Sequence, residues 1–190
     1  MPQTSAPLSI ELALLGYVRS QPMHGYEIYQ RLLSPGGLGN VWRIKQPLLY
    51  AYLKRLESAG LLRATVEAQT ERPPRRLLAI TPAGEEAFRR WLAQPVARGR
   101  ELRLEFLAKL YFARSEGQAV ALRLLDAQLQ QFDEWLGRLD SHRRNLPGEA
   151  VYERLVADYR RGQVSAAIGW LTAVHTELLR SEADERQASG

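Results

Sequence analysis

Hydrophobic residues recur at helical spacing in residues 45–62, KQPLLYAYLKRLESAGLL. Leu49, Leu53 and Leu56 follow the i, i+4, i+7 pattern of a helix that buries one face. Successive helical residues are rotated by about 100°, so the opposite face holds a different set of residues. These outward residues are Tyr50, Ala51 and Lys54. The pattern therefore predicts a helix with one apolar side and one exposed side that is aromatic, small and basic.

The sequence also marks both ends of this helix. Pro47 suits the first helical turn, where its missing N–H group costs no hydrogen bond. Gly60 stands where a left-handed residue commonly ends a helix, and Leu61 and Leu62 return the chain to the core. A helix of this length with a polar outer face fits the major groove of duplex DNA, and we interpret it as a recognition helix.

Two shorter amphipathic segments precede the recognition helix. Residues 8–19 carry one apolar stripe, and a second helix is predicted within residues 20–37. Tyr26, either Tyr29 or Leu32, and Leu33 are expected on the core side of the second helix, which the PGG at residues 35–37 terminates. Trp42, just before the recognition helix, is expected to pack against the base of that helix.

Two short strands and another helix follow the recognition helix. Residues 62–68 and 75–80 have the composition of strands, and the intervening QTERPP forms a turn whose prolines do not suit a central strand. Thr81 is a good N-cap and Pro82 suits the first helical turn, so the next helix opens there. The order helix, helix, helix, hairpin, helix predicts a winged helix-turn-helix domain in which the hairpin forms a small two-stranded wing.

The second half of the chain is predicted to be entirely helical. The stretch QPVARG at residues 94–99 interrupts the pattern, and three helices follow over residues 101–114, 117–144 and 149–180. The long middle helix has apolar residues at alternating spacings of three and four, which is a coiled-coil heptad seam. The seam residues are Leu122, Leu125, Leu129, Phe132, Leu136 and Leu139. The last helix is apolar on more than one side and therefore needs a partner beyond its own neighbours.

The charge of the chain divides at the same place. The net charge is +5, of which residues 1–98 carry +6 and residues 99–190 carry −1. A positive excess in the half that holds the recognition helix indicates an anionic partner such as nucleic acid. We therefore predict a mainly α protein. Its winged helix-turn-helix DNA-binding domain spans residues 1–98, and an all-α helical dimerisation and effector domain spans residues 99–190.

Composition and motifs exclude several other classes of protein. The chain has no cysteine, which excludes disulfide frameworks, cysteine nucleophiles and thiolate metal sites. His24, His142 and His175 lack the spacing of a helical metal site, and no nucleophile-elbow motif occurs. We expect no metal, no cofactor and no enzymatic activity. The start of the chain lacks signal-peptide features and its apolar runs are short, so we expect a cytoplasmic protein without a membrane partner.

Four stretches of the chain stand in a characteristic order: MHGYEIYQRL, LLYAYLKRLESAGLL, PPRRLLAITPAGEEAFRRWL and LRLEFLAKLYFA. Together they resemble the PadR family of transcriptional regulators, over residues 8 to 114. The resemblance implies a winged helix-turn-helix followed by a C-terminal helical dimerisation domain. The chain departs from the family pattern at Gln46-Pro47, where relatives usually have a small polar cap, and at Leu78, where tyrosine is common.

A winged-helix interpretation assigns DNA contacts to particular side chains. Gln46 is suited to pair with adenine and Ala51 to meet a thymine methyl, whereas arginines beside the helix and in the wing suit phosphates or the minor groove. Tyr50 is suited to a DNA contact, with structural packing as the alternative. The full set of predicted contacts is Arg43, Lys45, Gln46, Tyr50, Ala51, Lys54, Arg55, Arg72, Arg75 and Arg76.

These inferences predict a homodimeric repressor that binds a palindromic operator in double-stranded DNA and that a small planar or aromatic effector releases. Trp170, in the last helix, is the candidate residue for stacking on such an effector, with ordinary interface packing as the alternative. Two other functions stay open. One is a protein-interaction module that uses the winged helix only as a scaffold, and the other is a small-molecule binding protein whose basic half is incidental.

Overall fold

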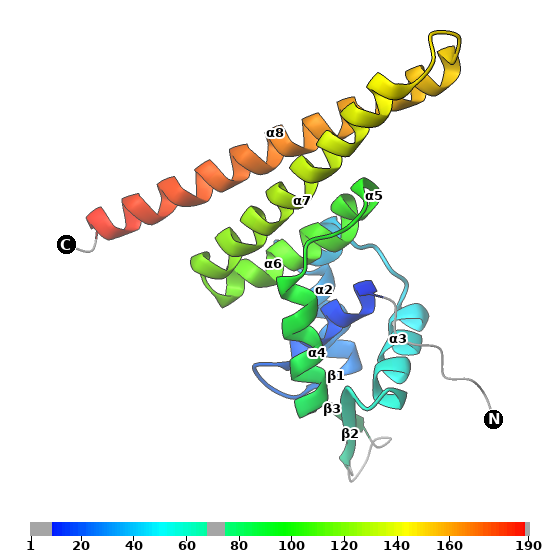
Figure 1. Ribbon diagram of the computed structural model, residues 1–190. Helices are drawn as coiled ribbons and strands as arrows, with labels where there is room; N and C mark the ends of the chain where they lie inside the picture. Colours follow the sequence, from blue (N-terminus) through cyan, green and yellow to red (C-terminus); the bar gives the residue numbers. More distant parts are fainter. Residues whose placement is uncertain (1–8, 68–74, 189–190) are drawn as a thin grey trace. The chain divides into compact units, whose positions relative to one another are not determined.

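The computed structural model describes residues 9–67 and 75–188, which are mainly helical with one small antiparallel sheet (Figure 1). This confirms the predicted fold class. The chain forms two compact units. Unit 1 comprises residues up to Ala93 together with Arg103–Phe112, and unit 2 comprises Gln94–Leu102 together with residues from Ala113 onward. The division into functional domains at residues 98 and 99 stays a prediction.

Helices pack around an apolar core in unit 1. They are the 3₁₀ turn η1 (Ser9–Leu12), α1 (Ala13–Val18), α2 (Gly25–Leu33), the 3₁₀ turn η2 (Leu38–Asn40), α3 (Gln46–Ser58) and α4 (Pro82–Ala93). The predicted apolar stripe of α3 is confirmed, because Leu49, Leu53 and Leu56 are all buried. Trp42 is also buried, and its ring stacks on that of Tyr52 at a centroid distance of 6.1 Å. The core therefore holds α3 by one face only.

The sheet of unit 1 has one more strand than predicted. Strands β2 (Leu62–Glu67) and β3 (Arg75–Ile80) form the expected hairpin, and β1 (Met23–His24) pairs with the other side of β3. The strand order is β1-β3-β2, and all pairs are antiparallel. A two-residue strand is too short to show alternation in the sequence, so it could not be predicted from the pattern. Strand β1 connects the start of α2 to the wing through its pairing with β3.

The predicted core side of α2 is wrong for two residues. Tyr26 is 57% exposed and Leu33 is 45% exposed, whereas Ile28 and Leu32 are completely buried. The helix begins at Gly25, so the buried stripe runs through Gly25, Ile28 and Leu32 at spacings of three and four. Tyr26 lies about 100° away from that stripe and is therefore turned outward.

A segment predicted to open the second half packs within unit 1. Residues Leu102–Phe106 form a π-helical turn, η3, which follows the short helix α5 (Gly99–Glu101) and leads into α6 (Leu107–Glu116). Within this segment, the ring of Phe112 lies edge-on to Phe88 at a centroid distance of 5.5 Å. The indole of Trp91 donates a hydrogen bond of 3.2 Å to Glu105. These contacts join α4 to η3 and to the middle of α6.

Unit 2 is dominated by a long antiparallel hairpin of α7 (Gln118–Asn145) and α8 (Val151–Ala188), which run side by side (Figure 1). The predicted heptad seam of α7 is confirmed at three of its six residues, because Leu125, Phe132 and Leu139 are buried. The other three, Leu122, Leu129 and Leu136, are only half-buried. The buried residues of α8 repeat at the same seven-residue spacing, at Ala157, Val164 and Leu171. Gln118 hydrogen-bonds the carbonyl of Leu178, which aligns the open ends of the two helices.

Candidate DNA-binding face

Helix α3 presents the residues predicted for base contact. Because the apolar stripe faces the core, Tyr50, Ala51 and Lys54 are all exposed, and Tyr50 keeps 44% of its surface free. Gln46, in the first turn, is also exposed. A helix anchored by one face and polar on the other can enter a major groove without disturbing the core.

Both ends of α3 are fixed by backbone geometry. Lys45 is the N-cap in an extended conformation and has no side-chain capping bond, and Pro47 lies in the first turn. Gly60 adopts the predicted left-handed conformation, with φ of 73°. The Thr81 hydroxyl donates a 2.7 Å hydrogen bond to the carbonyl of Gly60 and accepts a 3.0 Å bond from the backbone N–H of Gly84. The end of α3 is thereby joined to the start of α4.

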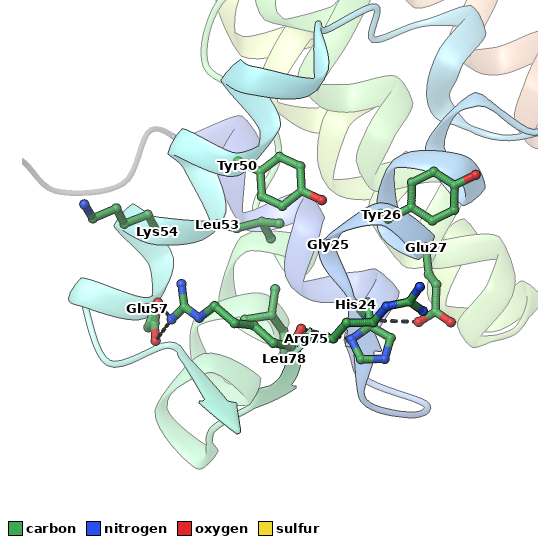
Figure 2. A pocket seen from close by; sticks show the side chains of 11 residues that line it. His24, Gly25, Tyr26, Glu27, Tyr50, Leu53, Lys54, Glu57, Arg75 and Leu78 are labelled. Atoms are coloured by element: carbon green, nitrogen blue, oxygen red, sulfur yellow. Dashed lines mark hydrogen bonds and ion pairs between the residues drawn. The ribbon is translucent and has the colours of Figure 1, made fainter. Parts of the chain in front are cut away.

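A cavity of about 500 Å³ lies between α3, the start of α2 and strand β3 (Figure 2). Figure 2 shows the Tyr50 ring directed toward the start of α2, and Lys54 leaving the same helix in the opposite direction. A Cβ atom at Gly25 would lie 2.7 Å from the Tyr50 ring, so any larger residue there would push the ring away. Tyr50 thus packs against the start of α2, as the packing alternative expected, and its contact with DNA stays a prediction.

Arg76 holds the wing against two helices. Its guanidinium contacts both carboxylate oxygens of Glu57 on α3, at 2.6 and 2.7 Å. Its backbone carbonyl lies 3.1 Å from Nδ1 of His24, which precedes α2. The backbone N–H of His24 in turn donates a 2.8 Å hydrogen bond to Glu27. Arg76 therefore positions strand β3, and its charge is already paired.

Arg55 is also engaged inside unit 1. Its guanidinium forms an ion pair with Glu11, whose carboxylate is completely buried, and the Nε to Oε2 distance is 3.1 Å. The same guanidinium lies over the Tyr52 ring at 4.9 Å. A buried carboxylate needs such a partner to remain charged. The predicted phosphate contact of Arg55 stays a prediction, but its guanidinium is turned toward η1 in this structure.

The remaining predicted cations divide into two groups, and the predicted effector residue lies elsewhere. Arg43, Lys45, Lys54 and Arg75 are exposed and form no ion pair among the described residues. Arg72 lies outside the described residues. Trp170, the predicted effector residue, belongs to α8 in unit 2, where it is 39% exposed.

Sequence reasoning missed three residues around the cavity. Tyr26, Glu57 and His24 line the cavity but were not assigned a role at this face. The adjacency of His24, Gly25 and Tyr26 was the available signal, but their common cavity depends on how β1 meets β3.

Neither a metal site nor a membrane segment was found in the parts of the chain that the structure covers. Among residues 9–67 and 75–188, no group of three or more histidine, cysteine, aspartate or glutamate residues could hold a metal ion. In the same ranges, no helix is both long and apolar enough to cross a membrane.

The fold and this face define the class of protein. A helix-turn-helix whose second helix exposes a polar, basic face, flanked by an antiparallel wing, is a winged helix-turn-helix DNA-binding module. Comparison with known families agrees: residues 14–90 match the Transcriptional regulator PadR-like family, and residues 102–178 match the Virulence activator alpha C-term family. Residues 14–90 therefore form a domain of the PadR-like family of transcriptional regulators.

Individual relatives are distant but span most of the chain. The Negative transcriptional regulator PadR of Bacillus subtilis is 25% identical over 148 residues, which cover 78% of this chain and 75% of the relative. A protein of Mycobacterium tuberculosis described as a probable transcriptional regulator is 28% identical over 192 residues, covering 90% of this chain and 98% of the relative.

Two solved structures of Bacillus subtilis PadR were also matched. The complex with operator DNA has a TM-score of 0.44 at 22% identity and covers 88% of this chain and 98% of that chain. The complex with p-coumaric acid has a TM-score of 0.39 at 21% identity and covers 90% and 99%.

Proposed function

We propose that this protein is a homodimeric repressor that occupies a palindromic operator and is released by a small planar effector. The observation that carries the proposal is the exposed face of α3, which stands beside cations of unit 1 that form no ion pair within residues 9–67 and 75–112. Repression is supported by the B. subtilis relative, which is named a negative transcriptional regulator. DNA as the partner also implies action in the cytoplasm.

Base reading falls to the first turns of α3. Gln46 can bridge an adenine and Ala51 can meet a thymine methyl, while Lys54 can reach a guanine or a phosphate. Arg43, Lys45 and Arg75 supply phosphate contacts that position the helix without reading sequence. We assign Tyr50 to neither group, because the contact of its ring with α2 also fixes where the ring can reach. Arg72 keeps its proposed place at the wing.

The dimer is supported by a second apolar seam on α8. Tyr152, Leu155 and Tyr159 are 74%, 63% and 66% exposed, although one face of the helix already packs on α7. Exposed small residues continue the same line at spacings of three and four: Gly162, Ala166, Gly169 and Ala173. Bulky apolar and small residues in one seam favour a close helix partner, and a second copy would place two α3 helices about 34 Å apart or a multiple of it.

A duplex-binding experiment tests the proposal. Bound duplexes are selected from a random pool, and fluorescence anisotropy then compares the selected site with unrelated DNA at several salt concentrations. We expect a palindrome, and we expect Lys54→Ala to weaken the selected site by about tenfold while affecting unrelated DNA less. Arg75→Ala should weaken both duplexes and reduce the salt slope by about one unit.

Arg123→Ala on α7 is the matched control, because Arg123 is exposed and lies outside unit 1. It should leave both affinities unchanged. Selection of no preferred sequence, or equal losses from Arg123→Ala and Arg75→Ala, would contradict the proposal. A preferred but asymmetric sequence would contradict the palindromic, dimeric part of it.

A further inference from the structure

A second cavity, of about 820 Å³, lies entirely within unit 2. Its walls come from three places in the chain. Phe132 and Trp135 belong to α7, Arg160 belongs to α8, and Arg98 and Arg100 belong to the linker, which we define as residues 94–102. A cavity of this size is typical of small-molecule sites.

The floor of the cavity is apolar and aromatic. Phe132 is completely buried and Trp135 is half-buried, and their rings meet edge-on at a centroid distance of 5.8 Å. A Cβ atom at Gly99 would lie 3.5 Å from the Trp135 indole, so the linker backbone lies close to that ring. Val164 adds a buried aliphatic surface. This floor suits a flat or compact apolar group.

The rim of the cavity is cationic. Arg100 and Arg160 are exposed, and neither forms an ion pair within residues 9–67 and 75–188. Arg98 forms a long ion pair with Glu101, at 4.0 Å. The described lining contains three arginines and no carboxylate. Guanidinium groups bind carboxylates and phosphates strongly, so this rim favours an anion and repels a cation.

The linker is fixed to α7 just before it reaches the cavity. The backbone N–H of Val96 donates a 2.7 Å hydrogen bond to the side-chain oxygen of Gln128, and the Gln128 amide donates a 3.0 Å bond to the carbonyl of Val96. Both residues are buried. The same linker connects α4 to the segment that starts at Arg103, and these two belong to unit 1. A ligand that touches Arg98 and Arg100 therefore acts on the covalent connection to the DNA-binding unit.

We propose that this cavity binds a compact organic anion, with its apolar body on Phe132 and Trp135 and its anionic group between Arg100 and Arg160. Trp170 does not line the cavity, so Trp135 replaces it as the aromatic contact. The regulatory consequence rests on the proposed function: the bound anion stiffens the linker and changes the affinity for operator DNA. The binding site itself does not depend on that function.

Isothermal titration calorimetry of the full chain tests the site with three probes of matched shape. They are 2-naphthoate (anionic), 2-naphthamide (neutral) and 2-naphthylmethylammonium (cationic). We expect 2-naphthoate to bind at least about tenfold more tightly than the neutral probe, and the cationic probe not to bind. Equal affinity for all three probes, or no binding of 2-naphthoate at millimolar concentration, would overturn the proposal.

Variants locate the binding. The double variant Arg100→Gln, Arg160→Gln should weaken the affinity for 2-naphthoate by about tenfold or more. Trp135→Leu should weaken the affinity for both the anionic and the neutral probe, because both place a naphthalene ring on the indole. Arg123→Gln, which removes an exposed arginine of α7 outside the cavity, and Trp170→Phe should retain the wild-type affinity. If Trp170→Phe abolishes binding while the double arginine variant does not, the site lies elsewhere.

DNA binding is measured separately, by anisotropy with a selected duplex in the presence and absence of 2-naphthoate. A shift in duplex affinity that the double arginine variant loses supports the regulatory part. Anion binding with unchanged duplex affinity overturns the regulatory part and leaves the site. Failure to bind any duplex counts against the proposed function, and the calorimetry still decides the site.

Discussion

Ion pairs decide which arginines of unit 1 remain available to DNA. Arg55 is paired with Glu11, 44 positions away, and Arg76 with Glu57, 19 positions away. The sequence predicted that both arginines lie near the recognition helix, but a helical wheel cannot show a carboxylate that another element brings to the same place. The DNA-binding face therefore has fewer unpaired charges than a count of its basic residues suggests.

Removing Glu57 should release Arg76. We expect Glu57→Gln to bind unrelated duplex more tightly than wild type and to steepen the salt dependence by about one unit, because a freed guanidinium can neutralise a phosphate. Anisotropy titrations at several salt concentrations measure both effects. Glu86→Gln on α4 changes the net charge equally but removes an exposed carboxylate that pairs with Arg90 on its own helix. An equal effect from the two variants would show that overall charge alone is responsible.

The pair of Arg19 and Glu85 makes the stability of unit 1 depend on pH. Arg19 donates hydrogen bonds of 2.9 and 2.7 Å to the carboxylate, which lowers the pKa of Glu85 below its ordinary value of 4.5. Because the pKa is lower in the folded state, the stabilisation is complete at neutral pH and is lost as the pH falls through the folded-state value.

We therefore expect Glu85→Gln to lower the free energy of unfolding by about 1–2 kcal/mol at neutral pH. The difference from wild type should shrink as the pH falls through the lowered folded-state pKa, below which the carboxyl is protonated in both states. Urea unfolding at neutral pH and at an acidic pH below that pKa measures this, and Glu86→Gln should change stability by less than about 0.5 kcal/mol. A loss that is the same at both pH values would contradict the role of the charge.

At the scale of elements, the long periodic helices were predicted well, whereas the shortest strand was not predicted. The extent of α7 and the start of α4 at Pro82 follow from local patterns that tertiary contacts reinforce. Strand β1 depends on pairing with β3, which lies more than 50 positions later. Local periodicity contains no information about such a partner.

Helix α8 provides the test at this scale. We expect Leu155→Glu to convert a dimer into monomers, because a charge in the exposed seam would have to be buried without a partner. Sedimentation velocity over a range of protein concentrations measures the association. Ser165→Glu is the matched control, since Ser165 is exposed and lies to one side of both apolar seams. A wild-type chain that is monomeric throughout, or a Leu155→Glu variant that still dimerises, would contradict this use of α8.

At the scale of the whole molecule, the sequence predicted a basic first half and a helical second half but not the path between them. The chain passes from one unit to the other after Ala93, after Leu102 and after Phe112. Phe112 is drawn into unit 1 by aromatic contacts with Tyr17 and Phe88, which periodicity within its own helix cannot reveal. Periodicity also cannot show which tryptophan lines a cavity. The sequence predicted Trp170 as the effector contact, whereas the cavity of unit 2 lies where the linker meets Trp135.

The contact between Gln128 and Val96 has a consequence for sequence drift. Gln128 binds only main-chain atoms of Val96, so the bond pattern is indifferent to which side chain position 96 carries. Any apolar residue other than proline that fills the same space can stand there, since proline lacks the N–H that donates to Gln128. Position 128 has no such latitude, because asparagine is one methylene shorter and glutamate cannot donate to the carbonyl. Homologous chains that keep this connection should therefore vary at 96 and retain glutamine at 128.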